Sequence, residues 1–363
     1  MAPAAIVARV ANKIVDMAEM LQARATILVV ETLGILAANI DARIQMSNAC
    51  SWDRVGLQVG DPEALVGAVG VCHEVTERVI SEAAAQNINA LVAYHPLLFR
   101  PTTSFISGTS APGRAYSLAA AGIGLYVVHT AFDVAPGGTA DALAESLGLR
   151  DARGFGLAES DPVLKIVVSV SPEAVEHMTS ALATAGVREI SGVDRRGSEA
   201  RIEMLAPASR EEELIAAILS VHPHAEPVLT VADVRGSSGM IGRIGEIEPQ
   251  ALASLVGMIG KKLDTSGIRV AGEPDRQVER VAVVPGSGTS LIAQAVAAGA
   301  EVLVTGDISH HAAVDARSRA MALIDAGHAP TERPGMAALV EVIGQVSDMV
   351  VDLTGVSTDP WSS

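Results

Sequence analysis

Short apolar runs alternate with helix-length segments along the chain from about residue 27 onward. Strand-length apolar runs occupy residues 64–72, 90–93 and 125–128, and helical patterns occupy residues 76–86 and 113–121. This alternation predicts βαβ units around a parallel sheet. Polar residues that follow the strands would then lie at the carboxyl ends of the strands, where open α/β sheets bind their ligands.

A different pattern begins near residues 160–162. Strands and helices are predicted there in alternation, at residues 164–170, 173–185, 201–205, 211–221 and 227–234. The arrangement is similar to a β-α-β-β-α-β unit and ends at a Gly/Ser-rich turn at residues 235–239. We therefore predict a compact domain inserted into a loop of the first fold.

The first pattern resumes after this insert. A helix is predicted at residues 250–262, a strand at 278–284, a glycine-rich turn at 285–289, a helix at 291–298 and a strand at 301–305. Both halves run strand, helix, strand, so we predict a two-half α/β core with pseudo-symmetric halves. The predicted order is an N-terminal extension at 1–28, a first half at 29–161, the insert at 162–238, a second half at 239–352 and a C-terminal tail at 353–363.

Composition narrows the class of protein. Apolar residues make up 49% of the 363 residues and aromatic residues only 2%, which suits close packing of helices on a sheet. A net charge of −16 argues against a nucleic-acid partner. Two cysteines, no apolar span of about 20 residues and no clear signal peptide predict a cytoplasmic protein without a membrane segment.

Four segments place metal-binding types of side chain just beyond a predicted strand. They are Tyr94-His95-Pro96, the run from His129 to Asp133, the run from Asp307 to His310 and His311, and the run from His328 to Glu332. Imidazole nitrogen and carboxylate oxygen suit zinc, manganese, iron or a similar divalent ion. The combination of residue types carries this prediction more than any one spacing does.

Each segment has a structural alternative. A single histidine at a strand end is more often a hydrogen-bonded structural residue than a ligand. His328 and Glu332 share one face if the segment is helical, but Pro330 favours a loop or a first turn, and a surface ion pair is the alternative. We expect Trp52 to be buried and Asp53 to cap the residues that follow it.

The glycine-rich turn at residues 286–289 has two interpretations as well. Its backbone N–H groups could hold an anion, although the turn lacks the lysine of a Walker motif. Close packing of a helix on a strand explains the glycines equally well, so we assign no nucleotide or other organic cofactor to it.

Several motifs resemble those of the NIF-three-like family, whose members are named GTP cyclohydrolase 1 type 2 homologues. Residues 51–62 (SWDRVGLQVGDP) are similar to its WDNVGLQVGDP signature, and residues 129–138 are similar to its HTNLDxAPGG segment. Residues 305–311 resemble its TGD…H motif, and residues 327–332 resemble GHxxTE. The insert resembles the ferredoxin-like CutA/PII-like domain of longer members, with residues 222–227 similar to HPYEEP.

The resemblance implies two metal ions in a cleft between the halves. Its ligand positions correspond to Tyr94, His95, Asp133, His328 and Glu332. Tyr94 stands where the family has histidine, and a phenol has an ordinary pKa of about 10. A strongly Lewis-acidic ion could bind the phenolate, but we favour a neutral phenol, and therefore one tightly held ion and a second held weakly or not at all.

The resemblance also implies a homohexamer and a hydrolytic reaction, in which Asp133 or Glu332 orients or deprotonates water. His129, His310 and His311 are candidates for supporting the ligands or contacting substrate, and His129 could equally close its turn. Two classes of function stay open. One is a metal-dependent hydrolase of a nucleotide-like or phosphate-bearing small molecule, and the other is a non-catalytic metal-binding regulatory or scaffold protein.

Overall fold

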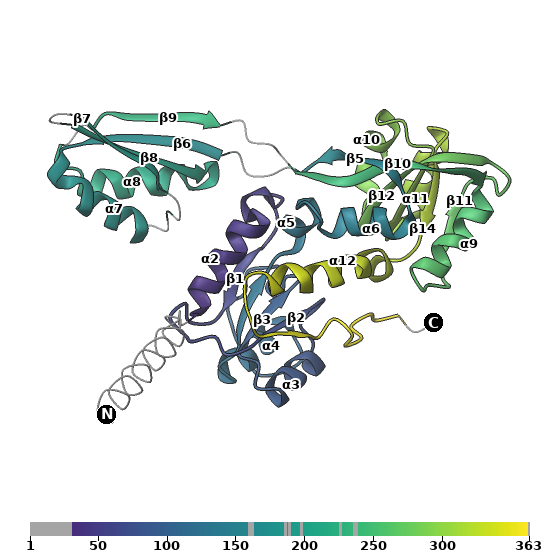
Figure 1. Ribbon diagram of the computed structural model, residues 1–363, viewed down its shortest axis with the longest axis horizontal. Coiled ribbons are helices and arrows are strands. Elements are labelled where there is room, and N and C mark those ends of the chain that lie inside the picture. The colour runs from purple at the N-terminus through teal and green to yellow at the C-terminus, as the bar shows by residue number, and fades with distance from the viewer. Residues whose placement is uncertain are drawn as a thin grey trace, which may run out of the picture.

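The computed structural model describes residues 31–158, 163–184, 187, 190–196, 199–224, 227–234 and 239–361. The predicted N-terminal extension, most of the Gly/Ser-rich turn and Glu226 of the HPYEEP-like motif lie outside the described residues. Three sheets organise the described chain, and Figure 1 shows them in three separate regions, each with its own helices. Among the described helices, none has the length and apolar character needed to cross a bilayer.

The first sheet has five strands in the order β1-β4-β3-β2-β15. Their bounds are Gly56–Val59, Gly124–Val127, Ala90–Ala93, Val69–Cys72 and Val350–Asp352. All of them run parallel except β1. One apolar core packs α2 (Leu33–Ile44) and α12 (His328–Gly344) on one face, and another packs α3 (Glu77–Ala85) and α4 (Ala111–Ala120) on the opposite face.

The second sheet has six strands in the order β11-β14-β13-β12-β10-β5. Their bounds are Arg269–Ala271, Ala322–Asp325, Val302–Gly306, Gln277–Ser287, Met240–Ala251 and Arg150–Leu157. The three central strands β12, β13 and β14 run parallel. Helices α6 (Thr139–Leu147) and α9 (Leu252–Lys262) share one core with this sheet, and α10 (Ile292–Ala297) and α11 (His310–Ser318) share another.

Each of these two sheets contains one strand from the part of the chain that otherwise forms the other sheet. Strand β5 precedes the insert but pairs with β10 in the second sheet, and β15 near the C-terminus pairs with β2 in the first. Helices α12 and α5 (His129–Val134) connect to the strand ends that line the candidate site. The mixed α/β class predicted from the alternating pattern is confirmed.

The third sheet is antiparallel, with the order β7-β8-β6-β9. Along the chain it comprises β6 (Val163–Val170), α7 (Val175–Thr184), β7 (Ile190–Arg196), β8 (Glu199–Pro207), α8 (Glu211–Val221) and β9 (Leu229–Val234). Its buried core consists of its own residues, from Leu164 to Ile218. Figure 1 shows this block set apart from the other sheets, beyond the ends of β5 and β10.

Several local predictions agree with the structure, and others need correction. Strand β3 and helix α8 have the predicted bounds, and α12 begins at His328 with Pro330 in its first turn. The helix predicted from residue 250 begins at Leu252, because β10 continues to Ala251. The expectation that Trp52 is buried is wrong, since the side chain is 51% exposed at the mouth of a cavity. The short 3₁₀ helices are Met46–Asn48, Pro172–Ala174, Ala208–Arg210 and Thr289–Leu291.

Candidate metal centre

Parallel strands of the first sheet end at one edge and bring three histidines there. His73 follows β2, His95 follows β3 and His129 follows β4. Strands β2 and β3 run in register, with Cys72 beside Ala93, so the residues just beyond them are neighbours in space. On the other side, the first turn of α12, which follows β14 of the second sheet, carries His328 and Glu332. The site therefore lies where the carboxyl ends of the parallel strands of two sheets meet.

Glu332 is the centre of this group and is only 2% exposed. Its Oε2 accepts from Nε2 of His73 at 2.8 Å and from Nε2 of His95 at 3.1 Å. Its Oε1 lies 3.0 Å from Nε2 of His328. Three imidazoles thus contact one buried carboxylate, each through its Nε2 atom.

The protonation of the group follows from burial and these contacts. Burial opposes ionisation of Glu332, but hydrogen bonds from His328, His73 and His95 hold its pKa well below the ordinary value. The hydrogen bond to Glu332 raises the pKa of His328 to about 9. Burial lowers the pKa of His95 despite the same carboxylate. A buried anion of this kind needs compensating positive charge, from protonated imidazole or from a cation.

The donor set has dimensions close to those of a metal site. One ligand atom each from His73, His95 and Glu332 all lie within 4.8 Å of one another. Zinc bonds of about 2.0–2.1 Å in a tetrahedron place donors roughly 3.3 Å apart, so small shifts of these side chains suffice to surround one ion. His73 and His328 also have a second partner, because Nδ1 of His73 lies 3.2 Å from the Thr358 hydroxyl and Nδ1 of His328 lies 2.7 Å from Asp307 Oδ2. Such partners are typical of metal-binding histidines.

Tyr94 and Asp133 form a second buried pair beside the imidazoles. The Tyr94 hydroxyl donates to Asp133 Oδ1 at 2.6 Å, and the two residues are 1% and 7% exposed. Burial, reinforced by the charge of Asp133, raises the pKa of Tyr94 well above its ordinary value. Burial also raises the pKa of Asp133 to about 6. The raised pKa and the hydrogen bond that the hydroxyl donates to Asp133 both favour a neutral phenol at Tyr94.

Asp53 and His129 form a third pair. Asp53 Oδ1 lies 2.8 Å from His129 Nδ1, and Asp53 Oδ2 accepts from the Thr130 backbone N–H at 3.1 Å. Burial disfavours the charged forms of both residues. The contact between Asp53 and His129 nevertheless lowers the pKa of Asp53 and raises the pKa of His129. His129 adopts a φ of 31°, an uncommon value for a residue with a side chain. Asp53 thus orients the imidazole and holds the start of α5, far along the chain from the residues that it was expected to cap.

A cavity of about 440 Å³ opens beside these groups. Its lining includes Trp52, His129, Asp133, Ser287, His328 and Glu332. None of the described residues that line it is lysine or arginine. The cavity is large enough for a small molecule, and its polar groups are carboxylates, imidazoles and hydroxyls.

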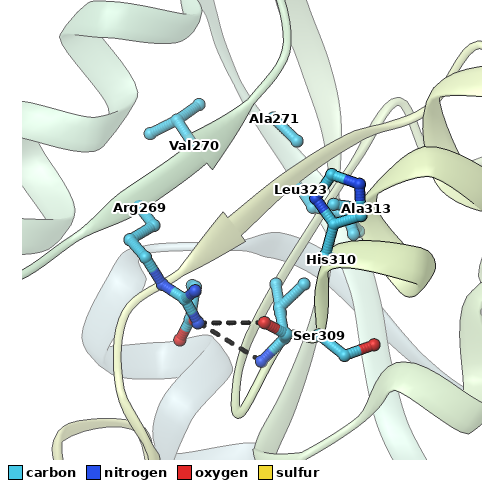
Figure 2. Close-up of a pocket in the computed structure, with 9 residues that line it drawn as sticks. Arg269, Val270, Ala271, Ser309, His310, Ala313 and Leu323 are labelled. Carbon is cyan, nitrogen blue, oxygen red and sulfur yellow. Dashed lines mark hydrogen bonds and ion pairs between the residues drawn. The ribbon is translucent and has the colours of Figure 1, made fainter.

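His310 and His311 lie elsewhere. His310 lines a separate cavity of about 190 Å³ with Arg269 and Ser309, and Figure 2 shows these side chains around it. Arg269 is already paired with Asp325 and donates to the Ile308 carbonyl oxygen at 2.9 Å. The His310 ring contacts the ring of His311, with centroids 5.6 Å apart.

The structure thus brings most of the predicted site residues together. His95, His328 and Glu332 are in direct contact, and Tyr94, His129 and Asp133 line the adjoining cavity. Sequence reasoning missed His73. The sequence does contain a signal for it. In Cys72-His73-Glu74 a histidine directly follows a predicted strand, as in the four segments with metal-binding types of side chain.

The geometry defines a class before any comparison with other proteins. The chain is an α/β protein with a histidine–carboxylate cluster around the buried Glu332, between two sheets, and a cavity of about 440 Å³ beside it.

Comparison with known proteins then gives the family. Residues 32–360 match the family described as Duf34/NIF3 (NGG1p interacting factor 3), and the chain belongs to it. A GTP cyclohydrolase 1 type 2 homolog of Mycobacterium tuberculosis is 32% identical over 352 residues, covering 86% of this chain and 92% of the relative. The homolog of Bacillus subtilis is 31% identical, with 77% and 83% covered. The crystal structure of a Bacillus cereus protein related to NIF3 aligns with a TM-score of 0.67 at 29% identity, over 92% and 99% of the two chains.

Proposed function

We propose that this protein binds one divalent metal ion through His73, His95 and Glu332, with His328 beside them, and uses it to hydrolyse a small molecule. The observation that carries the proposal is the convergence of these ligand atoms within 4.8 Å around a buried carboxylate. A cation at this place would replace the imidazole protons that now face Glu332, and it would supply the positive charge that the buried anion needs.

The Tyr94–Asp133 pair supports one ion in preference to two. A neutral phenol that donates to Asp133 occupies one lone pair of this carboxylate, which would otherwise be available to a second ion. Asp133 then serves as a proton acceptor at the cavity wall, because its pKa of about 6 suits general base catalysis near neutral pH. Asp133 as a direct ligand, with a second weakly held ion, is the alternative arrangement.

The proposed reaction divides roles among the residues around the cavity. A bound divalent ion would supply Lewis acidity, which lowers the pKa of water and polarises a carbonyl or phosphoryl oxygen. Glu332 and the imidazoles orient the reacting groups, and Asp133 takes the proton from attacking water. His129, held by Asp53, faces the same cavity and can return a proton to the leaving group.

The proposed substrate is a nucleotide-like small molecule. The relatives are named as GTP cyclohydrolase homologs, and the exposed Trp52 offers a flat surface for a heterocyclic ring at the mouth of the cavity. Ser287, Ser290 and Gln294, which also line the cavity, offer hydrogen bonds to such a ring. Because no lysine or arginine is found among the described residues that line the cavity, phosphate groups would extend toward solvent or contact the ion.

A hydrolysis screen with GTP and other nucleotides, in added manganese or zinc, tests this function. We expect turnover by the wild type, more turnover by Tyr94→His and none by Glu332→Gln or Glu332→Ala. Glu341→Ala is the matched control, because Glu341 is an exposed glutamate on the same helix. Metal binding without turnover by any variant would contradict the hydrolase and favour a metal-binding regulatory or scaffold role.

We also propose that residues 162–238 form an inserted CutA/PII-like domain of the ferredoxin-like class. The order of elements β6-α7-β7-β8-α8-β9 and the strand order β7-β8-β6-β9 support this assignment. His222 anchors the HPYEEP-like segment, since its Nε2 lies 2.8 Å from the Ser169 carbonyl oxygen.

The proposed assembly is a homohexamer, which rests on the resemblance to the family. Light scattering on the purified protein tests it directly. A mass of six chains supports the proposal, and a stable monomer contradicts it.

A further inference from the structure

The segment after β15 passes the candidate metal centre. Strand β15 runs parallel to β2, and Leu353 continues the pairing by donating its N–H to the Val71 carbonyl oxygen at 2.9 Å. Leu353 is buried, and Val356 packs on the same core. These contacts fix the backbone just before Thr358, whose hydroxyl lies 3.2 Å from Nδ1 of His73.

The chemistry of this contact depends on which ring nitrogen of His73 carries a proton. A carboxylate only accepts hydrogen bonds, so Nε2 of His73 must donate to Glu332 when no ion is bound. In a neutral ring, Nδ1 is then an acceptor and the Thr358 hydroxyl donates to it. When Nε2 binds a cation, the ring proton must be on Nδ1, and the hydroxyl must accept. A hydroxyl can both donate and accept, whereas a carboxylate only accepts and an ammonium group only donates.

We propose that Thr358 is a positioning residue for His73, and that the C-terminal segment thereby helps to build the metal centre. This inference rests on the proposed function, because it requires that His73 binds a metal ion. Thr358 holds the imidazole plane so that Nε2 points at Glu332, and it satisfies Nδ1 in both tautomers. The residue lies 285 positions from His73 in the sequence, so the site is completed only when the C-terminal segment has docked.

Cobalt(II) titration of the purified full chain, followed by visible absorption, tests the proposal. Thr358→Val removes the hydroxyl and keeps the shape, and Thr358→Ser restores the hydroxyl. We expect Thr358→Val to bind cobalt about 10–100-fold more weakly than the wild type, as for other partners of metal-binding histidines, and Thr358→Ser to recover most of the affinity. Thr354→Val is the matched control, because the Thr354 hydroxyl donates to Asp352 on the same segment at 2.6 Å.

The outcomes are distinguishable. Weaker binding by Thr358→Val alone, with an unchanged melting temperature of the metal-free protein, supports a positioning role. Equal affinities of wild type and Thr358→Val would overturn this inference and leave the proposed function intact. Loss of affinity in Thr354→Val as well, or no recovery in Thr358→Ser, would overturn it in favour of general damage to the segment. A wild type that binds no cobalt would overturn the proposed metal centre itself.

Discussion

At the scale of single residues, the buried Glu332 carboxylate determines the behaviour of the site. A carboxylate that is 2% exposed would ordinarily become protonated, yet three imidazole contacts keep it ionised. The imidazoles differ among themselves, because the more exposed His328 has a raised pKa and the more buried His95 has a lowered one. Their protonation should therefore be visible in the stability of the metal-free protein.

The pH dependence of stability tests the His328–Glu332 contact. The pKa of His328 is about 9 in the folded protein and ordinarily 6.5, so its contribution is fully present below about pH 6.5 and is lost as the pH rises through about 9. We expect the melting temperature of the metal-free protein to fall over this range. His328→Gln should fall less steeply, and added salt should reduce the difference because the ring is 36% exposed. Identical slopes for the two proteins would contradict the contact.

Tyr94→Phe tests the buried pair of Tyr94 and Asp133. The change leaves buried Asp133 without its 2.6 Å donor. Losing a buried hydrogen bond to a charged group should lower the free energy of unfolding by about 1–3 kcal/mol above pH 6, measured by urea denaturation. Tyr116→Phe on α4 is the control, because Tyr116 is 47% exposed. Equal stabilities of the two variants would show that the Tyr94 hydroxyl contributes nothing.

At the scale of elements, the ends of parallel strands position nearly every polar group of the site. The sequence predicted this principle and most of the residues, since apolar runs locate β2, β3 and β4 and the polar residues beyond them. It did not predict which of them meet. That His73 joins His95 depends on the register of β2 beside β3, and that both of them meet the Glu332 carboxylate depends on how α12 packs between two sheets. Neither feature follows from local patterns.

The glycine-rich segment predicted as a turn at residues 285–289 illustrates the same limit, since β12 continues through it to Ser287. Its backbone N–H groups at Gly286 and Gly288 donate to the hydroxyls of Thr331 and Thr305 at 2.9 and 2.8 Å. These two N–H groups are therefore already bonded within the protein and are not available to an anion. This favours close packing as the reason for the glycines. Gly286 also has a φ of 62°, and a Cβ there would collide with Glu332 Oε1.

Gly286 is not itself a proposed metal ligand, but Gly286→Ala should disturb the metal centre through Glu332. The new methyl group must displace the Glu332 carboxylate or strain a left-handed backbone. We expect lower thermal stability and weaker zinc binding in a competition titration. Gly257→Ala in α9 is the control, since a Cβ there meets nothing within 4 Å and should stabilise the helix by about 0.5–1 kcal/mol. Unchanged zinc affinity in Gly286→Ala would contradict the observed approach of this backbone to Glu332.

At the scale of the whole molecule, the antiparallel block is attached through a single pair of strands. Strands β5 and β10 pair up to Leu157 and Met240, and the Ala158 N–H donates to the Gly239 carbonyl oxygen at 2.8 Å. The block has its own core, and it is connected to the rest of the chain at the end of the β5–β10 pair formed by Leu157 and Met240. The metal centre should therefore be independent of it.

Replacing residues 159–238 with a short Asn-Gly turn tests this independence. The replacement converts the ends of β5 and β10 into a β-hairpin. We expect the shortened chain to fold cooperatively and to bind the same amount of zinc as the full chain, as measured by calorimetry. Loss of zinc binding in a shortened chain that is still folded would show that the block contributes to the site.

Elemental mass spectrometry of the purified, dialysed protein measures how much metal each chain retains. We expect about one equivalent of a divalent transition metal per chain, lost in His73→Ala and in Glu332→Gln and retained in the control His177→Ala, an exposed histidine on α7. Two tightly held equivalents in the wild type, or full retention by His73→Ala, would contradict this expectation.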